Sequence, residues 1–354
     1  MINPIKSQAC RLKVMDFESQ LTSYPTLLVY LPCYSDYKLA IEQAKQIRQI
    51  KKHNVASHDL RVQTMISING VDLSSEELKE VIDATDYHVI YPFGISGDIN
   101  ITQGFMHAIR LQADYLWILS ANDSVADTFI DAIGQHLLIR PEADLLVGCT
   151  SNKLGIREIN SVFDKENRDI PFGLISSVIY RTSKTANNFD SAVQLNWTGW
   201  GQLATIEASC IARNGLRVSL IAEKTLYNRS ERGHADSKIE SQRIRNGYAH
   251  SFFGMPIVIN SLFSGNPVRR KKLLNAWIES NWYLVNYFLK SDFKLWSAHL
   301  ASNQSWLRIL AFAVIRNASP AHRILFALSK VVPVEIWRDS PFAKWALGYS
   351  RGKK

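Results

Sequence analysis

The first half of the chain alternates short apolar runs with longer amphipathic stretches. Apolar runs at residues 26–31, 62–68, 87–91 and 115–119 have the length of buried strands. Helical spacing of apolar residues follows at 37–47. Residues 74–77 combine serines with first-turn carboxylates, and 101–112 form a third helix for which we expect Asn100 to be the N-cap. We expect Pro32 to end the first strand.

Strands and helices in this alternation are typical of a parallel α/β sheet with right-handed crossovers. In such sheets ligands bind beyond the carboxyl ends of the strands. Residues 32–34, 69–70 and 122–123 all follow predicted strands. We therefore expect the functional site at this edge of the sheet.

The pattern changes twice farther along the chain. Strands at 145–148, 177–180 and 218–221 are mixed with a helix at 201–214 that Gly215 is expected to cap. From Gly265 onward the sequence is helical, basic and rich in aromatic residues. The expected organisation is an N-terminal arm at 1–24, an α/β domain at 25–264 and a helical C-terminal region at 265–354.

Composition excludes several classes of protein. With 46% hydrophobic and 21% charged residues, the 354-residue chain is not intrinsically disordered. Its four cysteines are widely spaced, so neither a zinc site nor a disulfide scaffold is expected, and a reducing compartment fits better. No run approaches the roughly 18 apolar residues of a membrane-spanning helix, and the N-terminus lacks the apolar segment of a signal peptide. We expect a cytoplasmic protein.

The order of the strand-end segments resembles the family 2 glycosyltransferases of the GT-A fold, especially bacterial enzymes of O-antigen and other surface-polysaccharide synthesis. That family has a Pro-x-Tyr-like turn after the first strand, an Asn-Gly turn after the second, a helix with Asn and Gly, and a metal-binding Asp-x-Asp. The corresponding segments here are 31–35, 69–72, Asn100 with Gly104, and 120–123. The resemblance covers roughly residues 25–225 and implies a nucleotide-sugar-binding sheet with helices on both faces.

The resemblance implies that Asp123 binds Mg²⁺ or Mn²⁺ against the diphosphate of the donor. A hard divalent cation offsets the phosphate charge and stabilises the leaving group. Ser120 and Asn122 stand where the family has acids, which leaves Asp123 as the only full carboxylate of the segment. The alternative is that residues 122–124 simply cap the next helix.

A set of nine residues is predicted to take part in donor binding, most of them because they match the family's segments. The set comprises Pro32, Tyr34, Asn69, Asp72, Asn100, Asn122, Arg229, Arg232 and His234. Asn69 and Asp72 match the turn that contacts the base and ribose, although Ile68 replaces the acid that often precedes it. The segment 228–234 has the residue types that bind phosphate oxygens. The alternatives are an ordinary Asn-Gly turn and a solvated charged loop.

The acceptor side departs furthest from the family. Residues 196–202 contain no acid where the family has a Glu-Asp pair, although Trp197 and Trp200 are suited to sugar stacking as well as to core packing. An inverting transferase needs a base for the acceptor hydroxyl. The nearest carboxylates are Asp190, in an expected loop, and Glu207, within a helix. If neither serves, a retaining mechanism is the alternative.

Basic residues are concentrated at the C-terminal end. The net charge is +9, and the region from Gly265 onward holds fifteen Lys and Arg against four Asp and Glu, together with six of the nine tryptophans. The cluster Arg269–Lys272 precedes one helical face formed by Leu274, Trp277, Ile278, Trp282 and Val285. This pattern predicts a helix at an anionic membrane surface. The alternative is a helical region packed on the core with solvated basic side chains.

The sequence is compatible with three functions. The leading hypothesis is sugar transfer from a nucleotide-diphosphate donor to a saccharide, with a lipid-linked acceptor at the inner face of a cell membrane. The second is a non-catalytic carbohydrate- or nucleotide-binding protein on the same fold, suggested by the replaced acids. The third, nucleic-acid binding through the basic region, is disfavoured because no recognised nucleic-acid motif is present.

Overall fold

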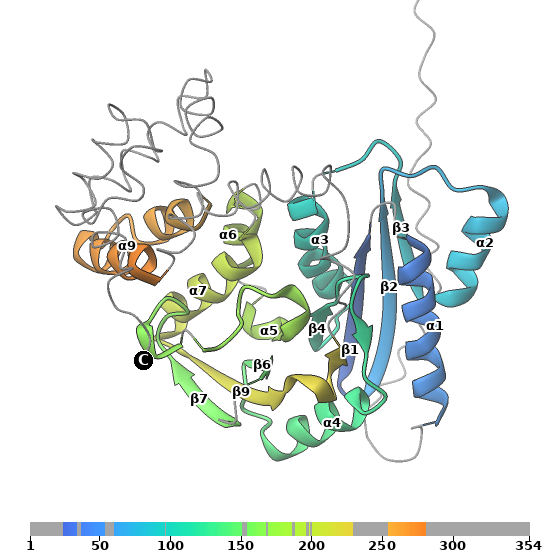
Figure 1. The fold of residues 1–354 in the computed structure, drawn as a ribbon, viewed down its shortest axis with the longest axis horizontal. Helices are drawn as coiled ribbons and strands as arrows, with labels where there is room; N and C mark the ends of the chain where they lie inside the picture. The colour runs from blue at the N-terminus through green and yellow to red at the C-terminus, as the bar shows by residue number, and fades with distance from the viewer. Residues whose placement is uncertain are drawn as a thin grey trace, which may run out of the picture.

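The structure is a computed structural model with a central sheet between layers of helices (Figure 1). It describes residues 24–33, 37–53, 60–95, 97–150, 154–167, 169–185, 188–195, 198, 200–228 and 254–280. Eight strands form the main sheet in the order β3-β2-β1-β4-β8-β6-β9-β7. This architecture confirms the predicted α/β class.

One half of the sheet is parallel and follows the predicted alternation. Its strands are β1 (Thr26–Cys33), β2 (Arg61–Asn69), β3 (Tyr87–Tyr91) and β4 (Tyr115–Ile118). The pairs β3-β2, β2-β1 and β1-β4 are all parallel. The connecting helices are α1 (Tyr37–His53), α2 (Ser75–Ala84) and α3 (Gly97–Arg110). The four carboxyl ends therefore meet at one edge.

The other half of the sheet is mixed. Strand β8 (Val178–Arg181) is antiparallel to both β4 and β6 (Leu145–Cys149), β9 (Leu216–Ala222) is parallel to β6, and β7 (Gly155–Ile159) is antiparallel to β9. A separate ribbon pairs β5 (Ser124–Val125) with β10 (Tyr227–Asn228). The remaining helices and turns are α4 (Phe129–Ile139), η1 (Lys165–Asn167), η2 (Ile175–Ser177), α5 (Thr182–Thr185), α6 (Phe189–Leu195), α7 (Gly201–Arg213), η5 (Glu223–Thr225) and α9 (Pro267–Ser280).

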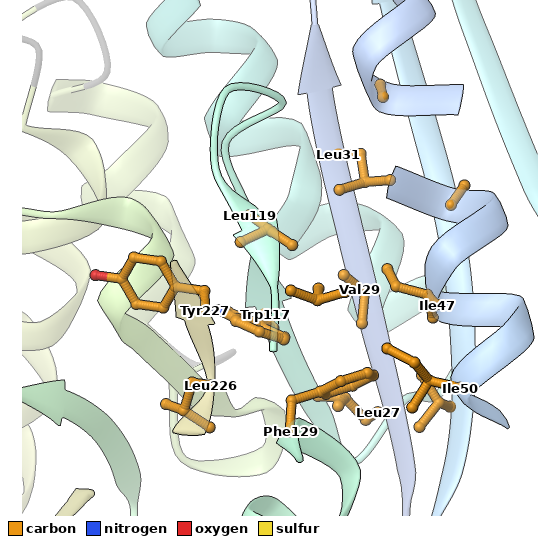
Figure 2. Close-up of a cluster of buried hydrophobic side chains, with 14 of the residues drawn as sticks. Leu27, Val29, Leu31, Ile47, Ile50, Trp117, Leu119, Phe129, Leu226 and Tyr227 are labelled. Atoms are coloured by element: carbon orange, nitrogen blue, oxygen red, sulfur yellow. The ribbon is translucent and has the colours of Figure 1, made fainter. Parts of the chain in front are cut away.

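Strand β1 is buried on both faces and supplies both hydrophobic cores. Leu27, Val29 and Leu31 face a cluster with α1, α2 and α4, whereas Leu28 and Tyr30 face a cluster with α3 and α7. In the first cluster, shown in Figure 2, the rings of Trp117 and Phe129 lie 5.7 Å apart beside β1. A strand covered by helices on both sides loses the polar-apolar alternation of a half-exposed strand. This explains its continuous apolar run.

The two helices that follow β1 and β2 form as their sequences predict. The predicted apolar face of α1 is buried. Ser74 caps α2 through a reciprocal capping box, in which its hydroxyl accepts from the Glu77 N–H and the Glu77 carboxylate accepts from the Ser74 N–H. Hydrogen bonds from the Tyr37 hydroxyl and from Ser74 lower the pKa of Glu77 to about 2. The cap thus ties the N-terminus of α2 to that of α1.

The expected end of the first strand at Pro32 is wrong, because β1 continues to Cys33. Leu119 N–H donates to the Tyr30 carbonyl, so residue 30 faces β4, and alternation turns residue 32 to the same side. The last β1-β4 pair is Tyr30 with Ile118, so β4 has ended where Pro32 lies. Its missing N–H therefore costs no ladder hydrogen bond.

The expected N-cap role of Asn100 is also wrong, because α3 begins at Gly97 and Asn100 lies inside it. The helix packs closely on β1: a Cβ added at Gly104 would lie 2.8 Å from Tyr30 Cδ1. Helix α7 ends one residue before its predicted end. Asn214, rather than Gly215, is its left-handed cap, with φ of 54°. A short polar side chain can adopt this conformation, which explains the difference.

The segment 254–280 packs on the α/β core. Met255, Ile259 and Phe263 of its first part and Leu273 and Leu274 of α9 belong to the same buried cluster as β1 and α7. Hydrophobic packing therefore continues across the boundary expected between residues 264 and 265. Burial of Leu274 supports the alternative of a helix packed on the core. None of the described helices is both long enough and apolar enough to cross a membrane.

Candidate functional site

The carboxyl edge of the parallel strands brings the predicted site segments together. Pro32 on β1 pairs with Ser67 on β2, and Asn69 at the end of β2 pairs with Tyr91 at the end of β3. The neighbouring strand β4 ends at Ile118 and leads into the turn 120–123. The predicted edge site therefore contains Pro32, Asn69 and the segment of Asp123, although these residues lie far apart in sequence.

Asp123 closes a tight turn directly after β4. Its N–H donates to the Ser120 carbonyl at 3.0 Å, and the half-buried carboxylate accepts from the Ser176 hydroxyl at 2.6 Å. Asn122 is exposed, and its N–H donates to the Ser120 hydroxyl at 3.3 Å. The turn thus presents one carboxylate and one amide at the strand end.

Residues 122–124 do not cap the following helix, so that alternative is wrong. Helix α4 begins only at Phe129, with Thr128 at its N-cap position. Ser124 instead starts β5 and pairs with Asn228 of β10. Strand β5 and residues 126–128 therefore separate the turn from α4 along the chain.

The residues present fit a divalent cation that takes most of its ligands from a bound substrate. Among the described residues no group of three or more His, Cys, Asp or Glu could hold a metal ion. One carboxylate is nevertheless sufficient where donor phosphates and water complete the coordination, as is common for Mg²⁺. Asp123 and the Asn122 amide oxygen are the oxygen ligands that the turn offers.

Asn69 fastens the turn after β2 to the turn after β3. Its buried amide donates to the Ile95 carbonyl and accepts from the Ile95 N–H, both at 2.5 Å. Gly70 and Gly94 have φ of 68° and 72°, and a Cβ at Gly70 would lie 3.6 Å from Gly94 Cα. Asp72, three residues after Asn69, is exposed. Asn69 thus shapes this part of the edge, while Asp72 is the accessible carboxylate.

Asn100 lies below the site rather than on its surface. Its side-chain oxygen accepts from the hydroxyls of Tyr30 at 3.0 Å and Ser67 at 2.5 Å, and its carbonyl also accepts from Tyr30 at 2.9 Å. The residue is fully buried between α3, β1 and β2. Its environment is that of an internal brace, and burial raises the pKa of the Tyr30 hydroxyl that it holds.

Trp200 lies at the N-terminal end of α7 and is partly buried against both neighbouring hydrophobic clusters. A Cβ at Gly173 would lie 2.9 Å from its Cζ3 atom, so glycine there admits the indole. Much of the indole therefore packs on the core, as the structural alternative predicted. Tyr34, Trp197, Arg229, Arg232 and His234 lie outside the described residues.

The two candidate bases have opposite environments. Asp190 lies in the first turn of α6, not in a loop as expected, and is exposed. Glu207 lies inside α7 and is fully buried; its Oε2 accepts from the Ser161 hydroxyl at 2.9 Å and the Val162 N–H at 2.8 Å. Its Oε1 has no hydrogen-bond partner among the described residues. Glu207 therefore anchors the segment after β7, and Asp190 is the accessible carboxylate.

We expect Glu207 to make stability depend on pH. Burial raises its pKa to about 7, against lowering contributions from the Val162 N–H, the Ser161 hydroxyl and the Arg269 charge. A raised folded-state pKa gives stability that is complete below the unfolded value near 4.5 and is lost as the pH rises through 7. The loss is on the order of 3 kcal/mol. Urea denaturation from pH 4.5 to 8 measures it.

The variant Glu207→Gln should remove this part of the pH dependence, because a neutral amide replaces the titrating group. Exposed Glu158 on β7 offers a matched control, and Glu158→Gln should keep the wild-type profile. Identical profiles for Glu207→Gln and wild type would contradict the assignment.

Two side chains that contact the turn 120–123 could not be predicted from the sequence. Ser176 in η2 bonds to the Asp123 carboxylate, and Gln43 of α1 donates to the carbonyls of Ser120 and Asp123. Their separations from Asp123, 53 and 80 residues, leave no local pattern to detect. The sequence offers one signal for Gln43, because its position next to the apolar face of α1 predicts a buried side chain.

Comparison with known proteins identifies the fold. No family model matches the sequence, and no curated protein matches it significantly. S. aureus TarS residues 1–349 superpose with a TM-score of 0.56 at 11% identity, covering 93% of this chain and 92% of that one. The structure of the same fragment in complex with UDP-GlcNAc superposes with a TM-score of 0.56 at 10% identity, covering 92% of this chain and 91% of that one. A longer TarS structure gives 0.57 at 10% identity, covering 93% of this chain and 56% of that one. The chain has this GT-A-like α/β fold.

Proposed function

We propose that the protein transfers a sugar from a nucleoside-diphosphate donor to a saccharide acceptor. The observation that carries the proposal is the turn 120–123, which follows the carboxyl end of β4 next to that of β1 and carries the Asp123 carboxylate. Ligands of open α/β sheets bind at that edge. Support comes from the fold likeness to TarS, whose structure holds UDP-GlcNAc.

The donor would lie across the ends of the four parallel strands. Pro32, Asp72 and the turn shaped by Asn69 would lie around the base and ribose, with Tyr34 as a further predicted contact. Asn122 and Asp123 would face the diphosphate, joined by the predicted residues Arg229, Arg232 and His234. Asn100 contributes to donor binding through the packing of α3 rather than by contact.

Mg²⁺ or Mn²⁺ would be held at the diphosphate by Asp123, with the Asn122 amide oxygen and water as further ligands. When bound, such an ion stabilises the negative charge that develops on the leaving diphosphate. The chain's own task is to present one carboxylate in a fixed orientation, since Ser120 and Asn122 bring no further charge to the turn.

On the acceptor side, the proposal assigns sugar stacking to Trp200 and Trp197 and proton removal to Asp190. Helix α6 carries the exposed Asp190 in its first turn and packs on α7, and Trp200 lies at the N-terminal end of α7. A base in this position takes the acceptor proton as the new glycosidic bond forms. Burial of Glu207 in α7 supports the choice of Asp190 over Glu207 for this role.

Asp190→Asn should lower kcat by about 10²–10⁴-fold, the usual contribution of a general base. Glu207→Gln serves as the comparison and should keep the wild-type rate at pH 7, since its carboxylate is buried away from solvent. NMR of the product gives the anomeric configuration. Inverted product formed at the wild-type rate by Asp190→Asn would remove this residue from the mechanism.

A lipid-linked acceptor at the inner face of the cell membrane is the finer form of the proposal. Lys271 and Lys272 are exposed on α9 next to Val268, whose side chain is 81% exposed, and Arg270 is half-exposed. Arg269 instead donates to the Asn160 carbonyl at 3.0 Å. This basic face suits anionic headgroups. Leu274 of the predicted apolar face is buried, and the side chains of the other residues of that face lie outside the described part of the chain.

We expect Arg270→Gln, Lys271→Gln and Lys272→Gln together to weaken binding to phosphatidylglycerol vesicles about 100-fold, because each charge contributes on the order of 1 kcal/mol. Arg269 is retained to preserve its contact with residue 160. Co-sedimentation measures the effect, and Lys79→Gln on exposed α2 is the control. Equal binding of wild type to phosphatidylglycerol and phosphatidylcholine vesicles would rule out this surface.

The replaced acids at Ser120 and Asn122 favour one alternative, a non-catalytic nucleotide- or carbohydrate-binding protein. A thermal-shift screen with UDP, GDP, ADP, CDP and dTDP, with Mn²⁺ and with EDTA, tests the shared binding step. Stabilisation by at least one nucleotide is expected, and a larger shift with Mn²⁺. No stabilisation by any of the five would contradict both sugar transfer and nucleotide binding, and would leave only carbohydrate binding.

A further inference from the structure

Ser176 joins β4 and the turn that follows it through three hydrogen bonds. Its carbonyl accepts from the Trp117 indole N–H at 2.8 Å, and its hydroxyl accepts from the Ser120 N–H at 3.0 Å. The same hydroxyl donates to Asp123 Oδ2 at 2.6 Å. Ser176 is buried in η2 and is therefore shielded from competing water.

The direction of these bonds is fixed by chemistry. A backbone N–H can only donate, so the Ser176 hydroxyl must be the acceptor towards Ser120. Its single proton is then directed to the Asp123 carboxylate, which can only accept when ionised. A short hydroxyl-to-carboxylate bond is charge-assisted and stronger than a neutral one. The contact therefore fixes the rotation of the Asp123 carboxylate.

The turn is held from the α1 side as well. The Gln43 side-chain N–H₂ donates to the Ser120 carbonyl at 3.2 Å and to the Asp123 carbonyl. Gln43 is almost fully buried. The backbone of the turn and the side chain of Asp123 are thus held from two elements, α1 and η2, that are distant in sequence.

We propose that Ser176 is a positioning residue that orients Asp123 towards the donor diphosphate and its divalent cation. The inference rests on the proposed function. Partners behind a ligand typically matter by 10–100-fold in metal affinity or activity. Because the turn holds a single carboxylate, no second acid can compensate if Asp123 is misoriented.

The variant Ser176→Ala tests this role. Calorimetric titration of the wild type first identifies which of the five nucleoside diphosphates binds most tightly, and that nucleotide is then titrated into wild type and variant with Mn²⁺ and with EDTA. We expect the gain in affinity that Mn²⁺ gives to fall about 10-fold or more, with little change in EDTA. Ser176→Thr retains the hydroxyl and should restore most of the gain.

Ser177 provides a matched control in the same turn. Its buried hydroxyl donates to the carbonyls of Pro171 at 2.6 Å and Leu174 at 2.7 Å and does not reach Asp123. Ser177→Ala should lose stability as Ser176→Ala does, but keep the wild-type Mn²⁺ gain. Equal gains in Ser176→Ala and Ser177→Ala would overturn the inference. A wild type without any Mn²⁺ gain would overturn the proposed metal role itself, and the inference with it.

Discussion

Asp123→Ala is expected to lower sugar transfer by about 10³-fold or more and to remove Mn²⁺-dependent nucleotide binding. The ion's stabilisation of the leaving group amounts to several kcal/mol, and each 1.36 kcal/mol is tenfold in rate. Steady-state kinetics and calorimetry with Mn²⁺ measure the two effects. Loss of the acceptor for the buried Ser176 hydroxyl should also cost about 1–3 kcal/mol of stability.

Exposed Asp127, four residues farther along, is the control for Asp123. Asp127→Ala removes a carboxylate from the same connection between β4 and α4 without touching Ser176 or Gln43. It should keep both wild-type turnover and the Mn²⁺ response. Turnover of Asp123→Ala at the wild-type rate would refute the metal role of this carboxylate.

Asn100→Ala is expected to lower the free energy of unfolding by about 2–5 kcal/mol. The substitution leaves the buried Ser67 hydroxyl without its acceptor and removes one of the two acceptors of the buried Tyr30 hydroxyl, whose bond to the backbone carbonyl of residue 100 remains. A small cavity adds to this cost. Urea denaturation measures the loss, and Met106→Ala, at a partly exposed position of the same helix, should cost far less.

The KM for the donor separates this role of Asn100 from direct donor contact. An internal brace predicts a large loss of stability with a modest change in KM for the protein that remains folded. Full stability together with a much higher KM would show that Asn100 contacts the donor.

Most of the parallel half of the sheet could be predicted because its signals are local. The apolar runs are short and continuous where helices cover both faces of a strand, and the start of α2 carries its own cap. The errors at Pro32 and Asn100 arise where tertiary context decides. Strand β4 ends before it reaches residue 32, so Pro32 needs no N–H on that side. Asn100 lies within α3, where its side chain accepts hydrogen bonds from the Tyr30 and Ser67 hydroxyls of β1 and β2.

The location of the candidate site could be predicted, but the contacts that hold its residues in place could not. Strand order alone brings the segments of Pro32, Asn69 and Asp123 to one edge. The contact of Ser176 with Asp123 depends on the antiparallel return of the chain through η2 and β8, which no spacing in the sequence reveals. Burial of Glu207 and Leu274 likewise follows from packing between distant elements.

Donor turnover tests the central claim most directly. The purified full chain is incubated with UDP-GlcNAc and other nucleotide sugars in the presence of Mn²⁺, and release of the nucleoside diphosphate is followed by chromatography. We predict release from at least one donor, abolished by EDTA and by Asp123→Ala but not by Asp127→Ala. Tight binding of a nucleotide sugar without release, with or without saccharide acceptors, would contradict the enzymatic function and support the binding protein.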